Sequence, residues 1–389
     1  MKDNTRLTHT GRDPAVQYGM VNPPVYHAST VLFPTLAELQ AAVAKPYDGV
    51  YYGRYGTPLH FRLEEALAGL EGAAGAVTTC SGLAAITVAL MSVVETDCHL
   101  LVADNVYAPT RKLCDGLLAG LGVGTTYFDP LIDADGLAAL VEERTCALFL
   151  EAPGSLTFEM PDVPALAAAA HQRGLAVLLD NTWATPLYFR ALDHGVDISI
   201  QAATKYIVGH ADAMLGAVAG NADHYPKLRR TAIQMGYCAG PDDVYLGLRG
   251  LRTLALRLER HAANAATLCA WLGERAQVVR MLYPPLADDP GHALWKRDFT
   301  GASGLFGVLL QPCSQAALAA LVDGLRWFGM GFSWGGYESL ILPVNLASAR
   351  TATTWDAPGP LLRIHAGLED ADDLITDLEQ GFARMAAGG

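Results

Sequence analysis

From about residue 58 to residue 240, apolar runs of strand length alternate with helix-like stretches, and this alternation constrains the fold more than any other feature. Several of the runs are apolar at almost every position, so both faces of the strand are expected to be buried. Such strands separated by helices predict an α/β fold with a mostly parallel seven-stranded sheet sandwiched by helices. The predicted strands are 75–80, 99–104, 124–129, 146–151, 175–180, 197–202 and 216–220.

The chain of 389 residues has room for two or three domains. Residues 1–57 are irregular and rich in Tyr, Pro and Gly, which predicts an arm that packs on a neighbouring subunit. Residues 58–250 form the predicted large domain. We place its end inside a long helical stretch that begins with Gly-Pro-Asp-Asp at 240–243, where proline and acidic residues suit a first turn.

Residues 251–389 are expected to form a smaller α+β domain. In its last helix Leu374, Leu378 and Phe382 recur four residues apart, which predicts one buried face. Its predicted strands are VVRMLYP, GLFGVLLQP, ESLILPV and LLRIHAG.

Composition and charge exclude several classes of protein. Hydrophobic residues make up 51% and charged residues 17%, which argues against disorder. The net charge of −13 disfavours nucleic acid or an anionic membrane as a partner. The first twenty residues lack the apolar core of a signal peptide, and the longest apolar run, 83–94, is too short to span a bilayer. Seven dispersed cysteines without a CxxC pair predict reduced thiols, a cytoplasmic location and no metal site.

Unusual polar groups follow three of the predicted strands. One strand ends in Asp180, a second leads to Thr204 and Lys205, and a third leads to Ser81 and Gly82 at the start of a helix. Taken singly, each has an ordinary explanation as a turn former, a solvated side chain or a helix cap. Because the carboxyl ends of parallel strands lie at one edge of a sheet, we expect the three groups to converge there.

Together these groups match what pyridoxal phosphate requires. Lys205 would hold the aldehyde as a Schiff base, and Asp180 would keep the pyridine nitrogen protonated. The backbone amides of Gly82 and Leu83, at a helix N-terminus, would bind the phosphate. The hydroxyl groups of Thr204 and Ser81 are further candidates for phosphate contacts.

With these residues in place, the chain resembles the pyridoxal-phosphate enzymes of cysteine and methionine metabolism, which have the aspartate-aminotransferase-like fold. The resemblance covers nearly the whole length. It is carried by several long motifs in the same order, namely NPPVYHASTVLF, YYGRYGTP, CSGLAAI, EAPGSLTFE, LLDNTWATPL, SIQAATKYIVGH, FSWGGYESLI and LLRIHAGLEDADDLI.

The resemblance implies further site residues. Tyr52 and Arg54 would reach across a dimer interface to the cofactor phosphate of the neighbouring subunit. The implied assembly is therefore a homodimer with shared active sites, or a homotetramer made of two such dimers. Many relatives have a serine shortly before the Thr-Lys pair, whereas this chain has Ala202 and Ala203.

On the substrate side, the resemblance implies that Tyr107 stacks on the pyridine ring and that Arg363 binds the α-carboxylate. Ser333 and Trp334 would line the substrate side. Ser155 stands where relatives acting at the γ-carbon commonly have asparagine, which favours the branch that acts at the β-carbon.

The implied reaction is the α,β-elimination of L-cystathionine, or of a related cysteine thioether, to homocysteine, pyruvate and ammonia. Three alternatives stay open: a γ-synthase or γ-lyase, a specialised biosynthetic C–S lyase, and a non-catalytic paralogue. Either Lys205 or Tyr107 would protonate the leaving sulfur. His210 is interpreted as ordering the loop after Lys205.

Overall fold

The structure is a computed structural model that describes residues 2–346 and 349–387. Its large sheet contains all seven predicted strands. Their order across the sheet is β1-β7-β6-β5-β4-β2-β3. Only β7 runs against the others, pairing antiparallel with β1 and β6, so the sheet is mostly parallel as predicted. The strands are β1 (Gly75–Thr79), β2 (His99–Ala103), β3 (Gly124–Phe128), β4 (Thr145–Glu151), β5 (Ala176–Asp180), β6 (Ile198–Gln201) and β7 (Gly216–Gly220).

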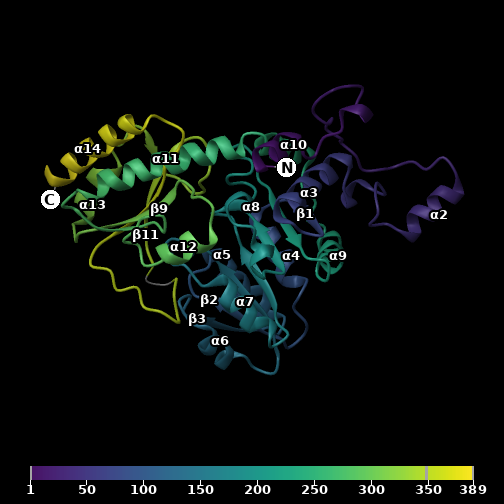
Figure 1. The fold of residues 1–389 in the computed structure, drawn as a ribbon, viewed down its shortest axis with the longest axis horizontal. Coiled ribbons are helices and arrows are strands. Elements are labelled where there is room, and N and C mark those ends of the chain that lie inside the picture. Colours follow the sequence, from purple (N-terminus) through teal and green to yellow (C-terminus); the bar gives the residue numbers. More distant parts are fainter. Residues whose placement is uncertain (1, 347–348, 388–389) are drawn as a thin grey trace.

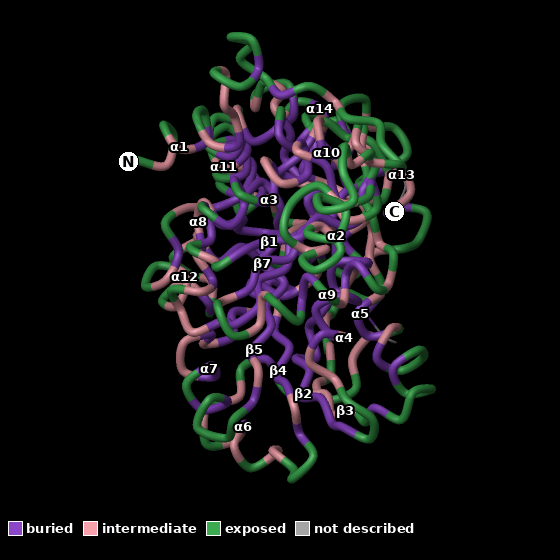
Figure 2. The backbone as a smooth tube through the Cα atoms, turned by 90° about the vertical axis from the view of Figure 1, so that its right-hand side faces the viewer, coloured by how far each residue is buried: buried purple, intermediate pink, exposed green. Residues whose placement is uncertain are grey.

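Helices cover both faces of this sheet and bury it, as Figure 2 shows for its central strands. Residues of β1, β2, β5, β6 and β7 are almost all buried, which explains why their sequences are apolar on both faces. The helices of this part of the chain are α3 (Pro58–Glu71), α4 (Gly82–Met91), α5 (Ala108–Lys112), α6 (Ala134–Leu140), α7 (Val163–His171), α8 (Thr185–Tyr188), α9 (Tyr225–Met235) and α10 (Pro241–Leu251). Short 3-10 turns occupy Pro14–Val16, Gly53–Tyr55 and Ala191–His194, and a π-helical segment, Leu113–Leu118, continues α5.

The C-terminal part forms a second sheet, with strand order β10-β11-β12-β9-β8. The four strands predicted here are present, whereas β10, with two residues, is too short to leave a sequence pattern. Leu374, Leu378 and Phe382 of the last helix are buried, as predicted. The elements are α11 (Leu254–Gly273), β8 (Val278–Leu282), α12 (His292–Asp298), β9 (Leu305–Leu310), α13 (Gln315–Val322), β10 (Phe328–Gly329), β11 (Ser339–Val344), β12 (Leu361–His365) and α14 (Ala371–Ala387).

The long helical stretch after residue 240 is divided into two helices. α10 ends at Leu251 and α11 begins at Leu254. Figure 1 shows α11 running along the part of the molecule that contains the second sheet. The break lies next to the predicted domain boundary at residue 250, which stays a prediction.

The N-terminal segment is more ordered than its composition suggested. It contains two helices, α1 (Asp3–His9) and α2 (Leu36–Ala44), where we expected irregular chain. In Figure 1 the part that carries α2 projects away from the body of the molecule. Thr35 caps α2 by accepting a hydrogen bond from the Glu38 amide, so a local cap starts this helix although none of its residues is buried.

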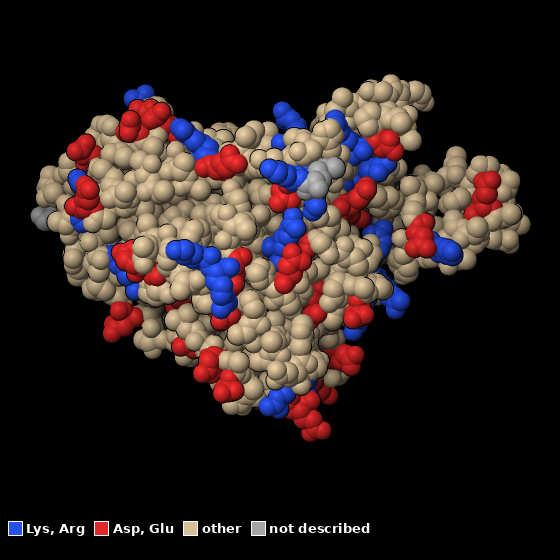
Figure 3. All heavy atoms as spheres, viewed as in Figure 1, with Lys and Arg blue, Asp and Glu red and all other residues tan. Residues whose placement is uncertain are grey.

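Acidic and basic side chains are mixed on the face of the molecule shown in Figure 3. No helix of the described residues is long and apolar enough to cross a membrane.

Candidate active site

The strand ends converge as the sequence predicted. β5 ends at Asp180, and β6, its neighbour, leads through residues 202–204 to Lys205. α4 begins at the same edge, because a side chain on Gly82 would come within 2.6 Å of the Ala202 Cβ atom. Gly82 is therefore required for the close approach of the helix N-terminus to the loop that carries Lys205.

Lys205 contacts the segment between β10 and β11. Its Nζ atom donates a hydrogen bond of 2.6 Å to the Ser333 hydroxyl and lies 5.5 Å from the centre of the Trp334 ring. Gly335 has a φ of +84°, and a Cβ atom there would lie about 3.0 Å from the Lys205 backbone, so both its conformation and its tight packing favour glycine. Burial, followed by the positive charge of Arg363, lowers the pKa of Lys205 to about 8.

Asp180 is buried, and its charge is stabilised by a neighbour in sequence. Burial raises its pKa, while hydrogen bonds from Thr182 and the positive charge of Lys205 act in the opposite direction. The Thr182 hydroxyl donates to the Asp180 Oδ1 atom at 2.5 Å, and the Thr182 amide donates to the same atom at 3.1 Å. The same hydroxyl accepts from the Ala202 amide, which joins the Asp180 strand to the Lys205 loop.

The start of α4 offers backbone amides to an anion. The Ser81 side chain accepts a hydrogen bond from the Ala84 amide and so caps the helix. The amides of Gly82 and Leu83 belong to the first turn, which has no acceptor within the helix. The Thr204 hydroxyl donates to the Leu215 carbonyl and accepts from the Leu215 amide, so its proton is already used within the chain. Its predicted phosphate contact therefore draws no support from this geometry.

Tyr107 and Arg363 lie at the same site on different elements. Tyr107 follows β2, and its phenol is half-exposed with a pKa raised by burial and by the nearby carboxyl groups of Glu151 and Asp180. Arg363, on β12, donates to the carbonyl oxygens of Gly331 and Ser333, at 3.3 and 3.0 Å. Burial lowers the pKa of Arg363, and Tyr107 partly offsets this effect. Both acceptors are neutral carbonyl oxygens, and among the described residues no carboxylate pairs with Arg363.

The other predicted residues have varied positions. Ser155 donates its amide to the Asn105 carbonyl, which places it beside the segment that leads to Tyr107. Arg54 donates to the Ile233 carbonyl at 2.5 Å, near the end of α9, and Tyr52 is 41% exposed. Their predicted contacts to a neighbouring subunit stay a prediction.

Sequence reasoning missed two side chains at this site. Glu151, the last residue of β4, accepts a hydrogen bond from the Tyr107 amide at 2.7 Å. His365, fully buried and with its pKa held well below its usual value by burial, accepts from the Gly335 amide. The rule that polar strand ends converge would have found Glu151, and the motif LLRIHAG contains His365.

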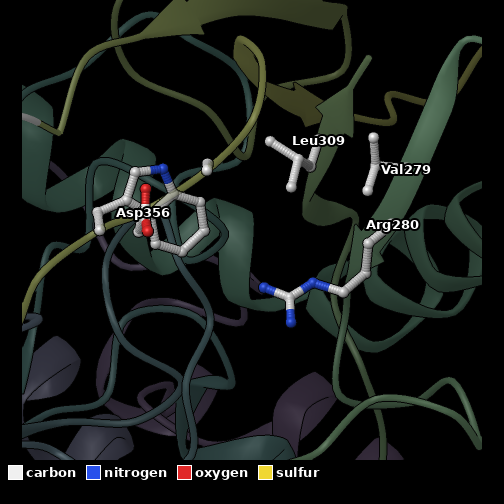
Figure 4. A pocket seen from close by; sticks show the side chains of 6 residues that line it. Val279, Arg280, Leu309 and Asp356 are labelled. Carbon is white, nitrogen blue, oxygen red and sulfur yellow. The ribbon is translucent and has the colours of Figure 1, made fainter. Parts of the chain in front are cut away.

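A surface hollow of about 350 Å³ lies elsewhere, on the second sheet (Figure 4). It is lined by Val279, Arg280, Leu309 and residues 355–357, and the Arg280 side chain points toward the side where Asp356 lies. None of the predicted site residues lines it, so it is separate from the chemistry described above.

The residues at the strand ends fit pyridoxal phosphate. A lysine with a lowered pKa suits covalent binding of an aldehyde, and a buried carboxylate near it suits a pyridinium nitrogen. The first turn of α4 packs closely on the Lys205 loop at Gly82, and its backbone amides are the groups that would bind the phosphate.

Known proteins of this kind match the entire chain. The family model described as Cys/Met metabolism PLP-dependent enzyme matches residues 4–383. A Rhizobium johnstonii protein, provisionally named cystathionine beta-lyase, is 49% identical over 388 residues, which cover 99% of this chain and 96% of that protein. Cystathionine beta-lyase MetC of Escherichia coli is 43% identical over 391 residues, covering 99% of each.

Among solved structures, cystathionine gamma synthase from Xanthomonas oryzae in complex with aminoacrylate and cysteine has a TM-score of 0.91 and 33% identity, covering 100% of both chains. The matched residues include every strand of both sheets. The chain therefore belongs to the pyridoxal-phosphate-dependent enzymes of cysteine and methionine metabolism, and pyridoxal phosphate is its cofactor.

Proposed function

We propose that this protein is a carbon–sulfur β-lyase that converts L-cystathionine and water to homocysteine, pyruvate and ammonia. The observation that carries the proposal is the placement of Lys205, Asp180 and Arg363 at one site. Relatives that match nearly the whole chain are named cystathionine beta-lyase. When bound, pyridoxal phosphate supplies an electron-withdrawing ring that makes the substrate Cα proton acidic.

Lys205 is the proposed general base. Its Nζ atom accepts the proton from the substrate Cα, and a pKa near 8 leaves part of the population neutral at physiological pH. The Ser333 hydroxyl, 2.6 Å away, orients this nitrogen. The Trp334 ring lies 5.5 Å from the same nitrogen.

The other residues bind and orient. Asp180 carries the negative charge that stabilises a protonated pyridine nitrogen, and Thr182 keeps that carboxylate in place. Arg363 binds the substrate α-carboxylate through a charge-assisted pair. The Tyr107 phenol, whose pKa is raised, stays protonated near neutral pH and can donate its proton to the leaving sulfur.

A related activity at the γ-carbon is the alternative, because solved γ-synthase structures share this fold along the whole chain. Ser155 supports the β-branch, since relatives acting at the γ-carbon commonly carry asparagine there. Product analysis decides between them. We expect purified holoprotein and L-cystathionine to yield pyruvate and homocysteine, whereas 2-oxobutyrate and cysteine would overturn the assignment.

The functional assembly is proposed to be a homodimer, or a tetramer of two dimers, in the cytoplasm. Each subunit's Tyr52 and Arg54 would contact the cofactor phosphate of its neighbour. Large apolar side chains of the arm support this, because Tyr18, Leu32 and Leu36 are 97%, 86% and 69% exposed in the single chain. The seven free cysteines agree with a reducing compartment.

A further inference from the structure

We propose that Glu151 is a positioning residue of the active site, a neutral carboxylic acid that holds the backbone of Tyr107 next to Asp180. This inference rests on the proposed function only in assigning Tyr107 and Asp180 to the cofactor. The protonation state and the Tyr107 contact of Glu151 can be measured without any turnover.

The geometry begins with strand pairing. Glu151 and Asp180 are the last residues of neighbouring parallel strands, and they are partners in the register of β4 and β5. Paired residues of parallel strands point to the same face, and such strands lie about 4.8 Å apart. The two carboxyl groups therefore leave the sheet side by side.

Glu151 uses one oxygen to hold the cofactor-stacking segment. Its Oε2 atom accepts the hydrogen bond from the Tyr107 amide at 2.7 Å. The same segment is fixed two residues earlier, where the Asn105 carbonyl accepts from the Ser155 amide. Glu151 thus supplies an acceptor that sets the position of Tyr107 relative to the strand end at Asp180.

The charges around Glu151 favour its neutral form. Among the residues that the structure describes, no cation forms an ion pair with it, and the charge closest in effect is Asp180. Burial and that like charge raise the pKa of Glu151 well above its usual value. Burial also raises the pKa of Asp180, but two hydrogen bonds from Thr182 and the positive charge of Lys205 act against this rise, and Glu151 has no such cation beside it in the described part of the chain. The pair therefore keeps its single negative charge on Asp180.

Neutrality has a consequence for the cofactor. An ionised Glu151 would add a second negative charge beside Asp180. The other ionisable groups of the site are Tyr107 on the segment after β2, Lys205 after β6 and Arg363 on β12. A neutral acid keeps the acceptor and leaves Asp180 as the anion opposite the pyridine nitrogen. Glutamine, which is also neutral and also has an acceptor oxygen, should then replace Glu151 without loss.

The experiment compares Glu151→Gln and Glu151→Leu with Glu143→Gln. Glu143 is exposed and lies just before the other end of β4, so it is a matched control for removing a carboxyl group. Protein labelled with carbon-13 at the glutamate carboxyl groups is titrated by NMR, and the resonance missing from each variant identifies the residue. Affinity for pyridoxal phosphate and the pH dependence of the cofactor's visible absorbance are then measured for each variant.

We expect the Glu151 resonance to show a protonated acid at pH 7 and the Glu143 resonance a carboxylate. Glu151→Gln should bind cofactor within about twofold of the wild type with an unchanged absorbance titration, while Glu151→Leu, which leaves the Tyr107 amide unpaired, should weaken binding about tenfold. A carboxylate at Glu151 at pH 7, or a shifted titration in Glu151→Gln, would overturn the neutral role.

Wild-type affinity in folded Glu151→Leu would overturn the positioning role. If Glu151→Leu does not fold, the resonance and the Glu151→Gln data still decide the question of charge, and Glu151→Met, a more flexible apolar replacement, replaces Leu for the affinity comparison. If the wild-type protein bound no pyridoxal phosphate, the proposed function would fail, while the NMR titration would still test the protonation of Glu151.

Discussion

Lys205 owes its chemistry to its surroundings, which hold its amine partly neutral near physiological pH. Burial removes water from the ammonium, and Arg363 repels it. The position of Lys205 could be predicted from the strand before it and the motif around it. Its hydrogen bond to Ser333 could not, because 128 residues separate the two side chains along the chain.

The neutral amine is the form that combines with an aldehyde, so uptake of cofactor by the cofactor-free protein should depend on pH. We expect the second-order rate of uptake to rise with pH and level off above about 8, following the pKa of Lys205. Stopped-flow absorbance at a series of pH values measures this rate. Lys205→Ala should show no covalent uptake and should lose activity by about 10³-fold or more.

Lys227 on α9 is exposed and provides the matched control. Lys227→Ala should retain the pH profile and the activity of the wild type. Full turnover by Lys205→Ala would refute the assignment of this lysine, and with it the enzyme function proposed above.

A second buried carboxyl group, Glu71 at the end of α3, makes stability depend on pH. Burial raises its pKa to about 7, although the nearby Ser199 hydroxyl and the Ala191 amide, which donates to its Oε2 atom, act in the opposite direction. Because the folded-state pKa is raised, the folded protein holds a proton that the unfolded chain has lost. The contribution of Glu71 to the free energy of unfolding is therefore fully present below about pH 4.5 and falls as the pH rises toward 7.

Glu71→Gln should remove this dependence, because glutamine has no proton to lose. Relative to the variant, the wild type should lose up to about 3 kcal/mol between pH 4.5 and 7. Urea unfolding at pH 5 and at pH 8 measures the difference. Glu143→Gln, the exposed control, should follow the wild type, and a constant difference between wild type and Glu71→Gln would contradict the raised pKa.

At the scale of elements, the sequence predicts strands better than it predicts what joins the two sheets. All strands of the large sheet were predictable because each is a short apolar run bounded by turns. The α1 and α2 helices of the arm were not predicted. Almost none of their residues is buried, so burial imposes little apolar pattern on their sequences. Only Leu7 is buried in α1, and no residue is buried in α2.

The connection between β11 and β12 is the clearest example of a feature hidden from sequence. Residues 350–353, here called the strap, contact Asp104 and Glu159, which lie in loops after β2 and β4 of the large sheet. The side chain of Asp104 accepts from the amides of residues 351–353 and from the Thr353 hydroxyl, and it pairs with Arg111. Arg350 pairs with Glu159 at 2.5 Å. These partners are about 190 to 250 residues apart in the sequence, so no local sequence pattern predicts their contacts.

Asp104→Asn should release the strap, because the change removes the charge that four donors and Arg111 share. Burial raises the pKa of Asp104, but the hydrogen bonds from Thr351 and Thr353 outweigh it and hold the pKa below its usual value. Loss of a buried charge partner costs about 3 kcal/mol. We expect a lower unfolding midpoint and faster tryptic cleavage after Arg350, whose side chain is only 5% exposed in the folded protein.

Asp223 is exposed and follows β7, so Asp223→Asn is the control and should digest like the wild type. Equal cleavage rates at Arg350 in Asp104→Asn and Asp223→Asn would show that the strap is held by other contacts. The chain runs from the strap through residues 354–360 to β12, which carries Arg363, so release of the strap should also raise the KM for substrate.

At the scale of the whole molecule, the arm carries many of the exposed large apolar side chains of the single chain, although its helix α1 packs on α3 and α11. Its composition predicted a segment that packs poorly on itself, and its exposed side chains agree. Tyr52 and Arg54 lie at the end of this arm, and Arg54 contacts α9 of its own chain. What the arm covers in the assembly depends on a second subunit, which one sequence cannot position.

Shared active sites can be tested by mixing two inactive variants. If Arg54 completes the site of the neighbouring subunit, an Arg54→Ala subunit paired with a Lys205→Ala subunit forms one site with both residues intact and one site with neither. Subunits that re-associate at random in equal amounts give half mixed dimers, so activity should return to about a quarter of the wild type. Steady-state assays after mild dissociation and re-association measure the recovery.

The control for this test is Arg230→Ala, an exposed arginine on α9, mixed with Lys205→Ala under the same conditions. Arg230→Ala should be active alone, and its activity should fall only in proportion to its dilution by Lys205→Ala. If each site were contained within one subunit, both sites of a mixed dimer would be defective. The Arg54→Ala and Lys205→Ala mixture would then recover no activity, even where native mass spectrometry detects mixed dimers. That result would place Arg54 in its own subunit's site. Recovery to about a quarter requires instead that the arm of one chain completes the strand-end site of the other.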